Sequence, residues 1–292
     1  MNGCVFTDVI ILGYGQIVNN CILKLNELKD KYSYNLKYIE YENTSLSTSI
    51  SLCEKEAIDF LQISSKEELT DYFKEINTQA LIVSAGNFYI FPKEIVEKEN
   101  LTIINFHSAL LPKYPGRNAQ TWAIFCGEKK AGATWHFVNE ELDAGKYIIQ
   151  TECDITDDTK AYELTGKIME CAYDGFVEII ENVLVNKYDK VQDMEIDPNR
   201  TIYKGKDIPG NGEFSLSDSV NYIYLLLRST DYGKSDIFPK MKTKIDSKEV
   251  YISNYKKIEN TGINEVTIDE KHIYIPFDTE YVLRLKYKLR EE

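Results

Sequence analysis

Short apolar runs alternate with helical segments along the first half of the chain. A run of about four to eight apolar residues between polar ones predicts a buried strand, and apolar residues three or four apart predict a helix. Strands are predicted over residues 8–12, 34–41, 58–61, 80–84, 101–104, 132–138 and 147–150. Helices are predicted over 17–28, 69–76 and 119–126, with another beginning near residue 92. This alternation predicts an α/β fold with a Rossmann-like, mostly parallel sheet flanked by helices.

The pattern changes after residue 150. A long helix is predicted from Thr156 or Asp158 to about Tyr188, because apolar residues recur there at helical spacing. Residues 193–212 are rich in Pro and Gly, which predicts a linker.

The last third of the chain predicts a small β-rich subdomain. A short helix is expected over residues 223–228, with Ser217 as its N-cap. Alternating segments at 249–255, 271–275 and 281–287 predict a small antiparallel sheet or open barrel. We therefore expect a main domain over residues 1–195, and a linker helix with a C-terminal β-rich subdomain over residues 196–292.

Composition and charge narrow the class of protein. The chain has 292 residues, 43% of them hydrophobic, and a formal net charge of −13. This predicts a folded globular protein and opposes a broad phosphate-binding surface. Arg284, Lys286, Lys288 and Arg290 place four cations on one face of a predicted strand. This face is the feature that most favours a nucleic-acid partner, but in so acidic a chain we interpret it as a solvated edge strand protected against aggregation.

The cysteines and the apolar runs bear on location. The six cysteines show no C-x-x-C spacing and no histidine at ligand spacing, so no metal site is expected. Scattered thiols are typical of a reduced cytoplasmic protein. There is no signal-peptide pattern and no apolar run of about 18 residues, so we expect a cytoplasmic protein with no membrane span.

The candidate chemistry gathers between residues 101 and 150. Asn105 and His107 follow an apolar strand and stand two positions apart, so both side chains point to the same side of that strand. Open α/β sheets bind their ligands at such strand ends. A loop stiffened by Pro and Gly follows from Ser108 to Arg117, and Asp143-Ala144-Gly145 follows the next apolar strand.

These three linked motifs resemble the formyltransferase family that uses N10-formyltetrahydrofolate. That family carries an Asn-x-His pair at a strand end, a Ser-x-Leu-Leu-Pro loop and an Asp-x-Gly loop, in this order. The resemblance implies N10-formyltetrahydrofolate as co-substrate and Asn105, His107 and Asp143 as the catalytic trio. It also implies that two loops bind the folate: Asn87, Phe88, Tyr89 and Ile90 in the first, and Glu140, Glu141 and Leu142 in the second.

Acyl transfer explains why these residue types suit the reaction. Negative charge develops on the carbonyl oxygen, and the N–H groups of Asn105 and His107 can donate to it, each contributing roughly 10²–10³ in rate. Asp143 is the acid/base candidate and would also hold His107 in its useful charge state. The alternative is that Asn105 and His107 form a satisfied polar cluster and that Asp143 is a turn residue before Gly145.

Four further residues are candidates for substrate binding. His136 shares a strand face with Thr134, so it either faces the acceptor or lies in the core. Ser108 could contact substrate or cap its loop. Lys113 and Arg117 could bind a phosphate or carboxylate, although solvated loop charges are the ordinary interpretation.

The acceptor is predicted to be the primary amine of a small molecule. A nucleotide-linked amino sugar or a specialised biosynthetic intermediate fits the acidic chain better than a nucleic acid does. Methionyl-tRNA formyltransferase is the alternative, and hydrolysis of formyltetrahydrofolate is a further one. A non-catalytic folate-binding module and a homodimer are also left open.

Overall fold

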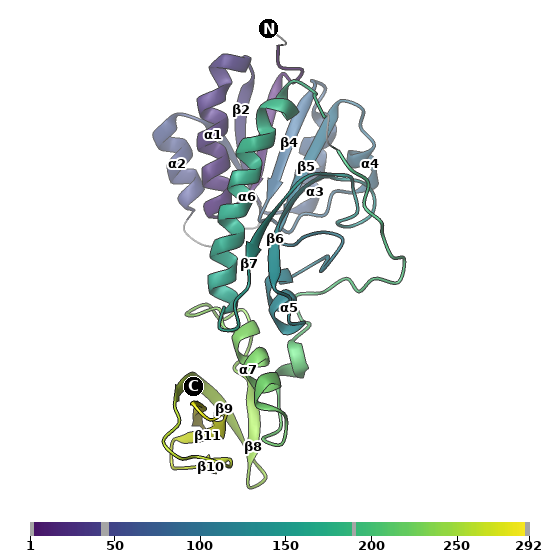
Figure 1. The fold of residues 1–292 in the computed structure, drawn as a ribbon. Helices are drawn as coiled ribbons and strands as arrows, with labels where there is room; N and C mark the ends of the chain where they lie inside the picture. The colour runs from purple at the N-terminus through teal and green to yellow at the C-terminus, as the bar shows by residue number, and fades with distance from the viewer. Residues whose placement is uncertain (1–2, 42–46, 189–190, 290–292) are drawn as a thin grey trace. The chain divides into compact units, whose positions relative to one another are not determined.

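The computed structural model describes residues 3–41, 47–188 and 191–289 (Figure 1). The chain forms two compact units. Unit 1 comprises residues 1–119, 130–154 and 165–203, and unit 2 comprises residues 120–129, 155–164 and 204–292. The expected division at residues 195 and 196 stays a prediction, because compactness does not show which part folds alone.

Unit 1 contains a seven-stranded sheet in the order β3-β2-β1-β4-β5-β6-β7. The first five of these strands are parallel, and β6 is antiparallel to both of its neighbours. The strands are β1 (Asp8–Gly13), β2 (Asn35–Tyr41), β3 (Asp59–Ile63), β4 (Ala80–Ala85), β5 (Leu101–His107), β6 (Lys130–Phe137) and β7 (Tyr147–Asp154). The predicted Rossmann-like, mostly parallel sheet flanked by helices is confirmed.

Helices cover the sheet because its strands are apolar on both faces. The helices before and between these strands are α1 (Gln16–Tyr32), α2 (Thr48–Glu56), α3 (Lys66–Glu75), α4 (Lys93–Val96) and α5 (Ala119–Phe125). Helix α3 begins after Ser65, whose side chain accepts a hydrogen bond from the Glu68 N–H, as its Ser-x-x-Glu pattern predicts. Its buried face carries Leu69 and Phe73 into the core. Helix α2 was not predicted.

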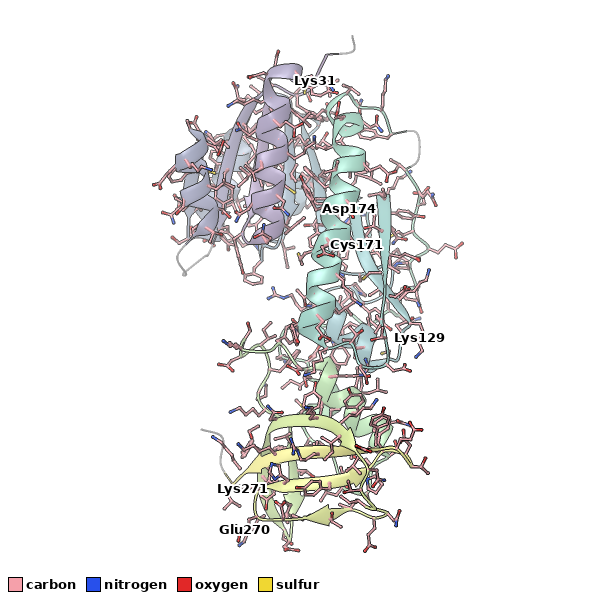
Figure 2. All side chains as sticks on the ribbon, turned by 60° about the vertical axis from the view of Figure 1, so that its left-hand side comes forward. Lys31, Lys129, Cys171, Asp174, Glu270 and Lys271 are labelled. Carbon is pink, nitrogen blue, oxygen red and sulfur yellow. The ribbon has the colours of Figure 1, made fainter. Side chains whose placement is uncertain are left out.

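The long helix α6 (Ala161–Leu184) packs against the β6 strand. Trp135 of β6 is fully buried, donates its indole N–H to the Ala172 carbonyl at 2.8 Å, and stacks on Phe176. The exposed side of the helix carries polar residues such as Asp174 (Figure 2). Helix α6 is shorter at both ends than the predicted helix, which ran from Thr156 or Asp158 to about Tyr188.

Unit 2 is built on a five-stranded antiparallel sheet in the order β10-β11-β12-β9-β8. Its elements are η1 (Pro209–Gly212), α7 (Val220–Ser229), β8 (Lys242–Ile245), β9 (Lys248–Glu259), β10 (Thr267–Ile268), β11 (His272–Pro276) and β12 (Tyr281–Lys288). Apolar side chains of β11 and β12 pack on Ile223 and Leu226 of α7. The expected β-rich C-terminal part is therefore confirmed.

Two details of this unit correct the sequence interpretation. The N-cap of α7 is Ser219, which accepts from the Tyr222 N–H, and not Ser217. Strand β12 pairs with β11 on one side and β9 on the other, so it is a central strand. The interpretation of Arg284 and Lys286 as protection of an edge strand was wrong, and Arg290 lies outside the described residues.

Helix length and hydropathy were also assessed for membrane spans. Over the described ranges, no helix combines the length and the apolar character needed to cross a bilayer.

The packing analysis predicts unequal costs for two Phe-to-Ala substitutions. Phe73 is fully buried in the core, whereas Phe88 is 45% exposed. Phe73→Ala should lower the free energy of unfolding by about 3–5 kcal/mol, because it removes apolar contacts and leaves a cavity. Phe88→Ala is the matched control and should cost about 1 kcal/mol or less. Urea unfolding measures both, and equal costs would contradict the described core.

Candidate active site

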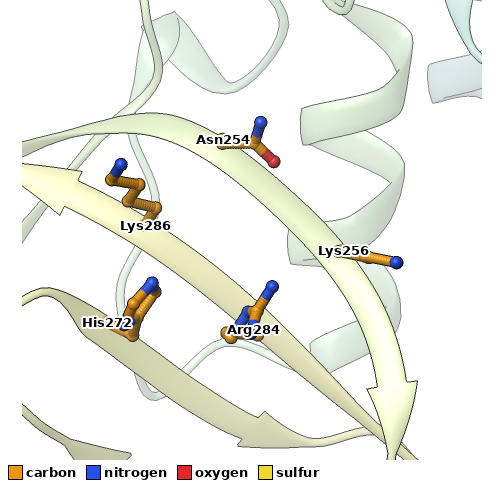
Figure 3. Close-up of a pocket in the computed structure, with 5 residues that line it drawn as sticks. All are labelled: Asn254, Lys256, His272, Arg284 and Lys286. Atoms are coloured by element: carbon orange, nitrogen blue, oxygen red, sulfur yellow. The ribbon is translucent and has the colours of Figure 1, made fainter.

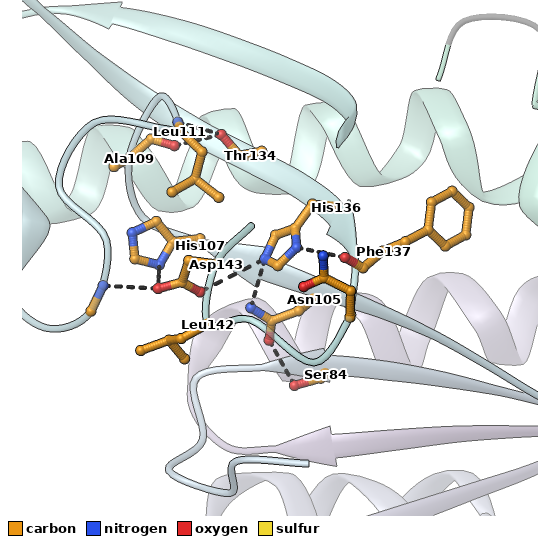
Figure 4. Close-up of polar contacts among 12 residues, drawn as sticks. Ser84, Asn105, His107, Ala109, Leu111, Thr134, His136, Phe137, Leu142 and Asp143 are labelled. Atoms are coloured by element: carbon orange, nitrogen blue, oxygen red, sulfur yellow. Dashed lines mark hydrogen bonds and ion pairs between the residues drawn. The ribbon is translucent and has the colours of Figure 1, made fainter. Parts of the chain in front are cut away.

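Strand register brings four polar side chains to one face of the sheet. Asn105 lies directly opposite His136 in the β5–β6 pair, and His107 lies directly opposite Thr134. Because side chains alternate along each strand, all four project from the same face. Figure 4 shows the resulting cluster. The predicted i, i+2 placement of Asn105 and His107 is present, and His136 joins them through cross-strand pairing.

The third predicted residue, Asp143, turns into this cluster. Its carboxylate accepts a hydrogen bond from the Gly116 N–H at 2.8 Å. It lies 3.5 Å from Nδ1 of His107 and 3.9 Å from Nε2 of His136. Asp143 is only 8% exposed, so its charge depends on these partners. His136 and Asp143, which are 31 and 38 positions from Asn105 in the sequence, thus join it in one polar cluster (Figure 4).

Two glycines allow the loops to approach this closely. A Cβ at Gly145 would lie 1.7 Å from the Phe137 carbonyl oxygen. Gly116 has a φ of +94°, and a Cβ there would lie 2.2 Å from the Tyr203 carbonyl oxygen. Any other residue at these positions would push the Asp143 loop or the Gly116 loop away from the cluster. Asp143 itself has a φ of 51°, an uncommon conformation that its polar contacts stabilise.

His136 is held as a neutral imidazole. Its Nδ1–H donates to the Phe137 carbonyl at 2.9 Å, so Nε2 is the acceptor, and it accepts from the Asn105 amide at 3.2 Å. Burial lowers the pKa of His136 to about 4, more strongly than the nearby Asp143 raises it. His136, predicted as a substrate-binding candidate, is therefore a buried neighbour of Asn105 and Asp143.

Ser84 fixes the orientation of the Asn105 amide. The Ser84 hydroxyl donates to Asn105 Oδ1 at 2.8 Å, and the Asn87 amide donates to Ser84 Oγ at 2.7 Å. The Asn105 oxygen therefore faces Ser84 and its NH₂ faces the cluster. One amide hydrogen goes to His136, which leaves the second for another acceptor. Sequence reasoning missed Ser84, although its position at the end of β4, beside Asn105 on β5, could have indicated it.

His107 is constrained from both ring nitrogens. Nε2 lies 2.9 Å from the Tyr114 carbonyl oxygen, which can only accept, so Nε2 carries a proton. Nδ1 faces the Asp143 carboxylate. Both nitrogens thus face oxygen atoms of the protein, which fixes the orientation of the ring. The loop that begins at Ser108 supplies Tyr114, so this loop and the ring are positioned together.

A buried hydroxyl fixes the course of the Ser108 loop. Thr134 Oγ1 donates to the Ala109 carbonyl at 2.6 Å and accepts from the Leu111 N–H at 3.1 Å. Gln150 donates to the Leu111 carbonyl at 2.7 Å. The loop is thereby tied to β6 and β7. Thr134 lies on the same face of β6 as His136, two residues before it in the strand.

Arg200 is the residue that the sequence analysis missed entirely. It lies in the predicted linker, and its side chain is only 9% exposed. Its guanidinium donates to the Leu142 carbonyl at 2.6 Å and to the Asp143 carbonyl at 3.3 Å, and it pairs with Glu141 at 3.2 Å. Arg200 therefore clamps the loop that presents Asp143. No local pattern indicated this, because its partners lie more than 50 positions away.

The segment after Arg200 also binds the Gly116 loop. The Tyr203 N–H donates to the Pro115 carbonyl at 3.0 Å, and the Arg117 N–H donates to the Tyr203 carbonyl at 2.9 Å. The loop of Gly116 and the loop of Asp143 are thus both bound by one short segment of the predicted linker, residues 200–203. Its sequence looked structureless because its partners are backbone groups of other loops.

The remaining substrate-binding candidates are Ser108, Lys113 and Arg117. Arg117 stacks on the ring of Phe88, with its guanidinium carbon 3.9 Å from the ring centroid. Lys113 is exposed and Ser108 is half-buried, and both interact with other groups of the protein. The assignment of these three residues to substrate stays a prediction.

The two candidate folate loops present apolar side chains beside the cluster. Phe88, Ile90 and Leu142 are 45%, 62% and 37% exposed. Tyr89 instead points into the core and its hydroxyl contacts Thr70, so only its backbone could face a ligand.

The other members of these loops are engaged by protein groups. Asn87 accepts from the Tyr89 N–H through its side-chain oxygen. Glu140 pairs with Lys93, and Glu141 pairs with Arg200. Folate binding by Asn87, Glu140 and Glu141 stays a prediction. Over the described ranges, no three His, Cys, Asp or Glu side chains are grouped as metal ligands would be.

Comparison with known proteins shows which family this chain resembles. Residues 42–180 match the family described as formyl transferase. The methionyl-tRNA formyltransferase of Clostridioides difficile (strain 630) is 30% identical over 214 residues, 70% of this chain and 67% of the relative. That of Thermodesulfovibrio yellowstonii is 29% identical over 201 residues, 67% of this chain and 60% of the relative. The chain thus spans about two thirds or less of the length of these curated relatives.

A solved structure shares the fold across almost the whole chain. The N-formyltransferase from Helicobacter canadensis, in complex with folinic acid and dTDP-3-aminofucose, has a TM-score of 0.72 at 20% identity. The alignment covers 96% of this chain and 99% of that one. This protein belongs to the formyltransferase family, as the three sequence motifs predicted.

The neutral state of His136 predicts a pH-dependent term in stability. Its pKa is about 4 in the folded protein and near the ordinary 6.5 when unfolded, so the unfolded chain binds the extra proton between these values. The contribution is complete above pH 6.5 and is lost as the pH falls towards 4, by about 3 kcal/mol. Urea unfolding of the wild type and of His136→Asn across this range measures it. A difference between the two proteins that does not change with pH would contradict it.

Proposed function

We propose that this protein transfers a formyl group from N10-formyltetrahydrofolate to the primary amine of a small molecule. One observation carries the proposal: Asn105, His107 and Asp143 meet in one cluster, with Asp143 buried against His107. Membership of the family and the three linked motifs support it. The proposed catalytic residues are these three.

The residues around the cluster fit a folate. Phe88, Ile90 and Leu142 expose apolar surface on the two loops that border the polar groups. A flat aromatic ring system can pack between such side chains while its polar edge meets backbone groups. The neighbour from Helicobacter canadensis was solved with folinic acid, a folate, which agrees with this fit.

Each member of the trio has a role in the proposed transfer. The folate supplies the formyl group as an electrophile. Asn105 donates its remaining amide hydrogen to the oxygen on which negative charge develops. The Nε2–H of His107, which donates to the Tyr114 carbonyl in this structure, would supply a second donor by exchanging that carbonyl for the formyl oxygen. Asp143 accepts the proton that the attacking amine must lose. Ser84 and His136 hold the Asn105 amide in the orientation that this requires.

A nucleotide-linked amino sugar is the acceptor class that we favour. The fold neighbour was solved with dTDP-3-aminofucose, and the likeness includes the C-terminal unit. The net charge of −13 also opposes binding of a long polyanion.

Methionyl-tRNA is the second candidate acceptor. The curated relatives at about 30% identity are methionyl-tRNA formyltransferases. The family match over residues 42–180 includes the trio. A tRNA acceptor requires a basic surface for phosphate contacts, which can be assayed directly.

Tetrahydrofolate release tests the proposed reaction. We expect release from N10-formyltetrahydrofolate only when a nucleotide-linked amino sugar is added, with mass spectrometry showing the formylated sugar. Asp143→Asn should lower kcat by about 10²–10⁴, because the proton acceptor is lost. Asp174→Asn, an identical change at an exposed position on α6, should leave kcat unchanged.

Other results would point elsewhere. Release with methionyl-tRNA and not with amino sugars would assign the second candidate acceptor, and release without any amine would assign a hydrolase. Absence of release in every case, with folate still bound in calorimetry, would assign a binding module. Equal rates for Asp143→Asn and the wild type would contradict the catalytic role.

Arg200 is predicted to act as a positioning residue. Arg200→Lys keeps the charge but loses the guanidinium fork that reaches two carbonyls, so the Asp143 loop should shift and kcat should fall by about 10- to 100-fold. The KM for folate should change less, and Arg200→Ala should lose more activity than Arg200→Lys. Lys204→Ala, an exposed cation in the same segment, is the control.

A purely structural role for Arg200 would give a different result. Both Arg200 variants would then lose stability in thermal unfolding while the kcat of the folded fraction stayed at the wild-type value.

A further inference from the structure

A cluster of unpaired cations lies on the C-terminal sheet, in unit 2. A pocket of about 390 Å³ is lined by Asn254 and Lys256 of β9, His272 of β11, and Arg284 and Lys286 of β12. Figure 3 shows these five side chains on neighbouring strands. Among the described residues none of the five lining side chains is a carboxylate, and the Asp269 carboxylate lies 3.5 Å from Nδ1 of His272. We call these five residues the cationic pocket.

The strand register places like charges opposite each other in the cationic pocket, which lowers the stability of the sheet. Arg284 lies directly opposite Lys256, and Lys286 lies between Asn254 on one side and His272 on the other. Like charges placed directly opposite each other in a sheet destabilise it. Arg284 and Lys286 are about 7 Å apart along one strand, so three cations share a small area. Packing does not require them, because the opposite face holds the apolar contacts with α7.

These three cations contrast with those lysines elsewhere on the protein that lie in ion pairs. Lys93, Lys130 and Lys242 each lie within 3.0 Å of a carboxylate oxygen. Along residues 3–41, 47–188 and 191–289, no carboxylate pairs with the side chain of Lys256, Arg284 or Lys286. A protein with 47 acidic residues against 34 basic ones has ample carboxylates to pair them. Strand register gathers these three cations in one pocket, an arrangement that suits an anion from outside the chain.

We propose that the cationic pocket binds the diphosphate group of a nucleotide. The pocket volume lies in the range of small-ligand sites. Arg284 supplies a planar fork that matches phosphate oxygens, and the two lysines supply point charges around it. Asn254 and His272 add hydrogen-bonding groups to the lining. This site lies in unit 2, whereas the proposed catalytic residues lie in unit 1.

A compact ligand suits this pocket better than a nucleic acid does. Three cations are few for a polyanion, whose binding depends on many phosphate contacts along an extended track. The remainder of the chain is strongly acidic and would repel such a partner. A diphosphate concentrates its charge within one pocket and meets all three cations at once.

Calorimetry of the full chain with inorganic pyrophosphate and with a nucleoside diphosphate tests the proposal. The triple variant Lys256→Gln, Arg284→Gln, Lys286→Gln should weaken binding by at least about tenfold. The matched control is Lys244→Gln, Lys248→Gln, Lys271→Gln, which removes the same number of cations from exposed positions of unit 2 and should retain wild-type binding. Without ligand, the pocket variant should melt at the same or a higher temperature than the control, because like-charge repulsion is relieved.

Three results would overturn this proposal. The first is unchanged binding in the pocket variant, and the second is an equal loss in the control. The third is a transfer RNA that binds through these cations more tightly than the nucleotide does. Because binding is measured without folate or amine, its loss in the pocket variant is independent of formyl transfer. A failure of formyl transfer would likewise leave the pyrophosphate result standing.

Discussion

A buried carboxylate organises the candidate active site. Asp143 is almost fully removed from solvent, and a carboxylate in that position must be met by hydrogen bonds or opposite charge. The Gly116 N–H supplies one partner and the ring of His107 supplies another. The close approach of two loops at Gly116 and Gly145 follows from this requirement.

The same requirement explains why residues from three separate parts of the chain act together. Strand register brings His136 opposite Asn105, and burial holds His136 neutral so that it accepts from the Asn105 amide. Arg200 holds the Asp143 loop in place by donating to the backbone carbonyls of Leu142 and Asp143. The cluster is therefore preorganised: the orientation of each donor is determined by a neighbour, which is the property that electrostatic stabilisation of a transition state requires.

The sequence predicted the parts of this site that depend on local patterns. The apolar run before Asn105 identified a strand end, and the two-residue spacing placed His107 beside it. The role of His136 depended on antiparallel pairing of β6, which periodicity alone does not reveal. Arg200 could not be found, because a guanidinium that binds backbone carbonyls leaves no signature in the loop it clamps. The edge-strand interpretation of β12 failed because the order of strands in a sheet depends on tertiary pairing, which the local sequence pattern does not show.

The central claim is that Asn105, His107 and Asp143 surround a single reacting carbon. A crystal structure with a non-transferring analogue of N10-formyltetrahydrofolate and the amine acceptor tests it most directly. The account predicts the formyl group within hydrogen-bond distance of the Asn105 amide, with the amine nitrogen beside the Asp143 carboxylate. A folate bound with its formyl group away from all three side chains would contradict it.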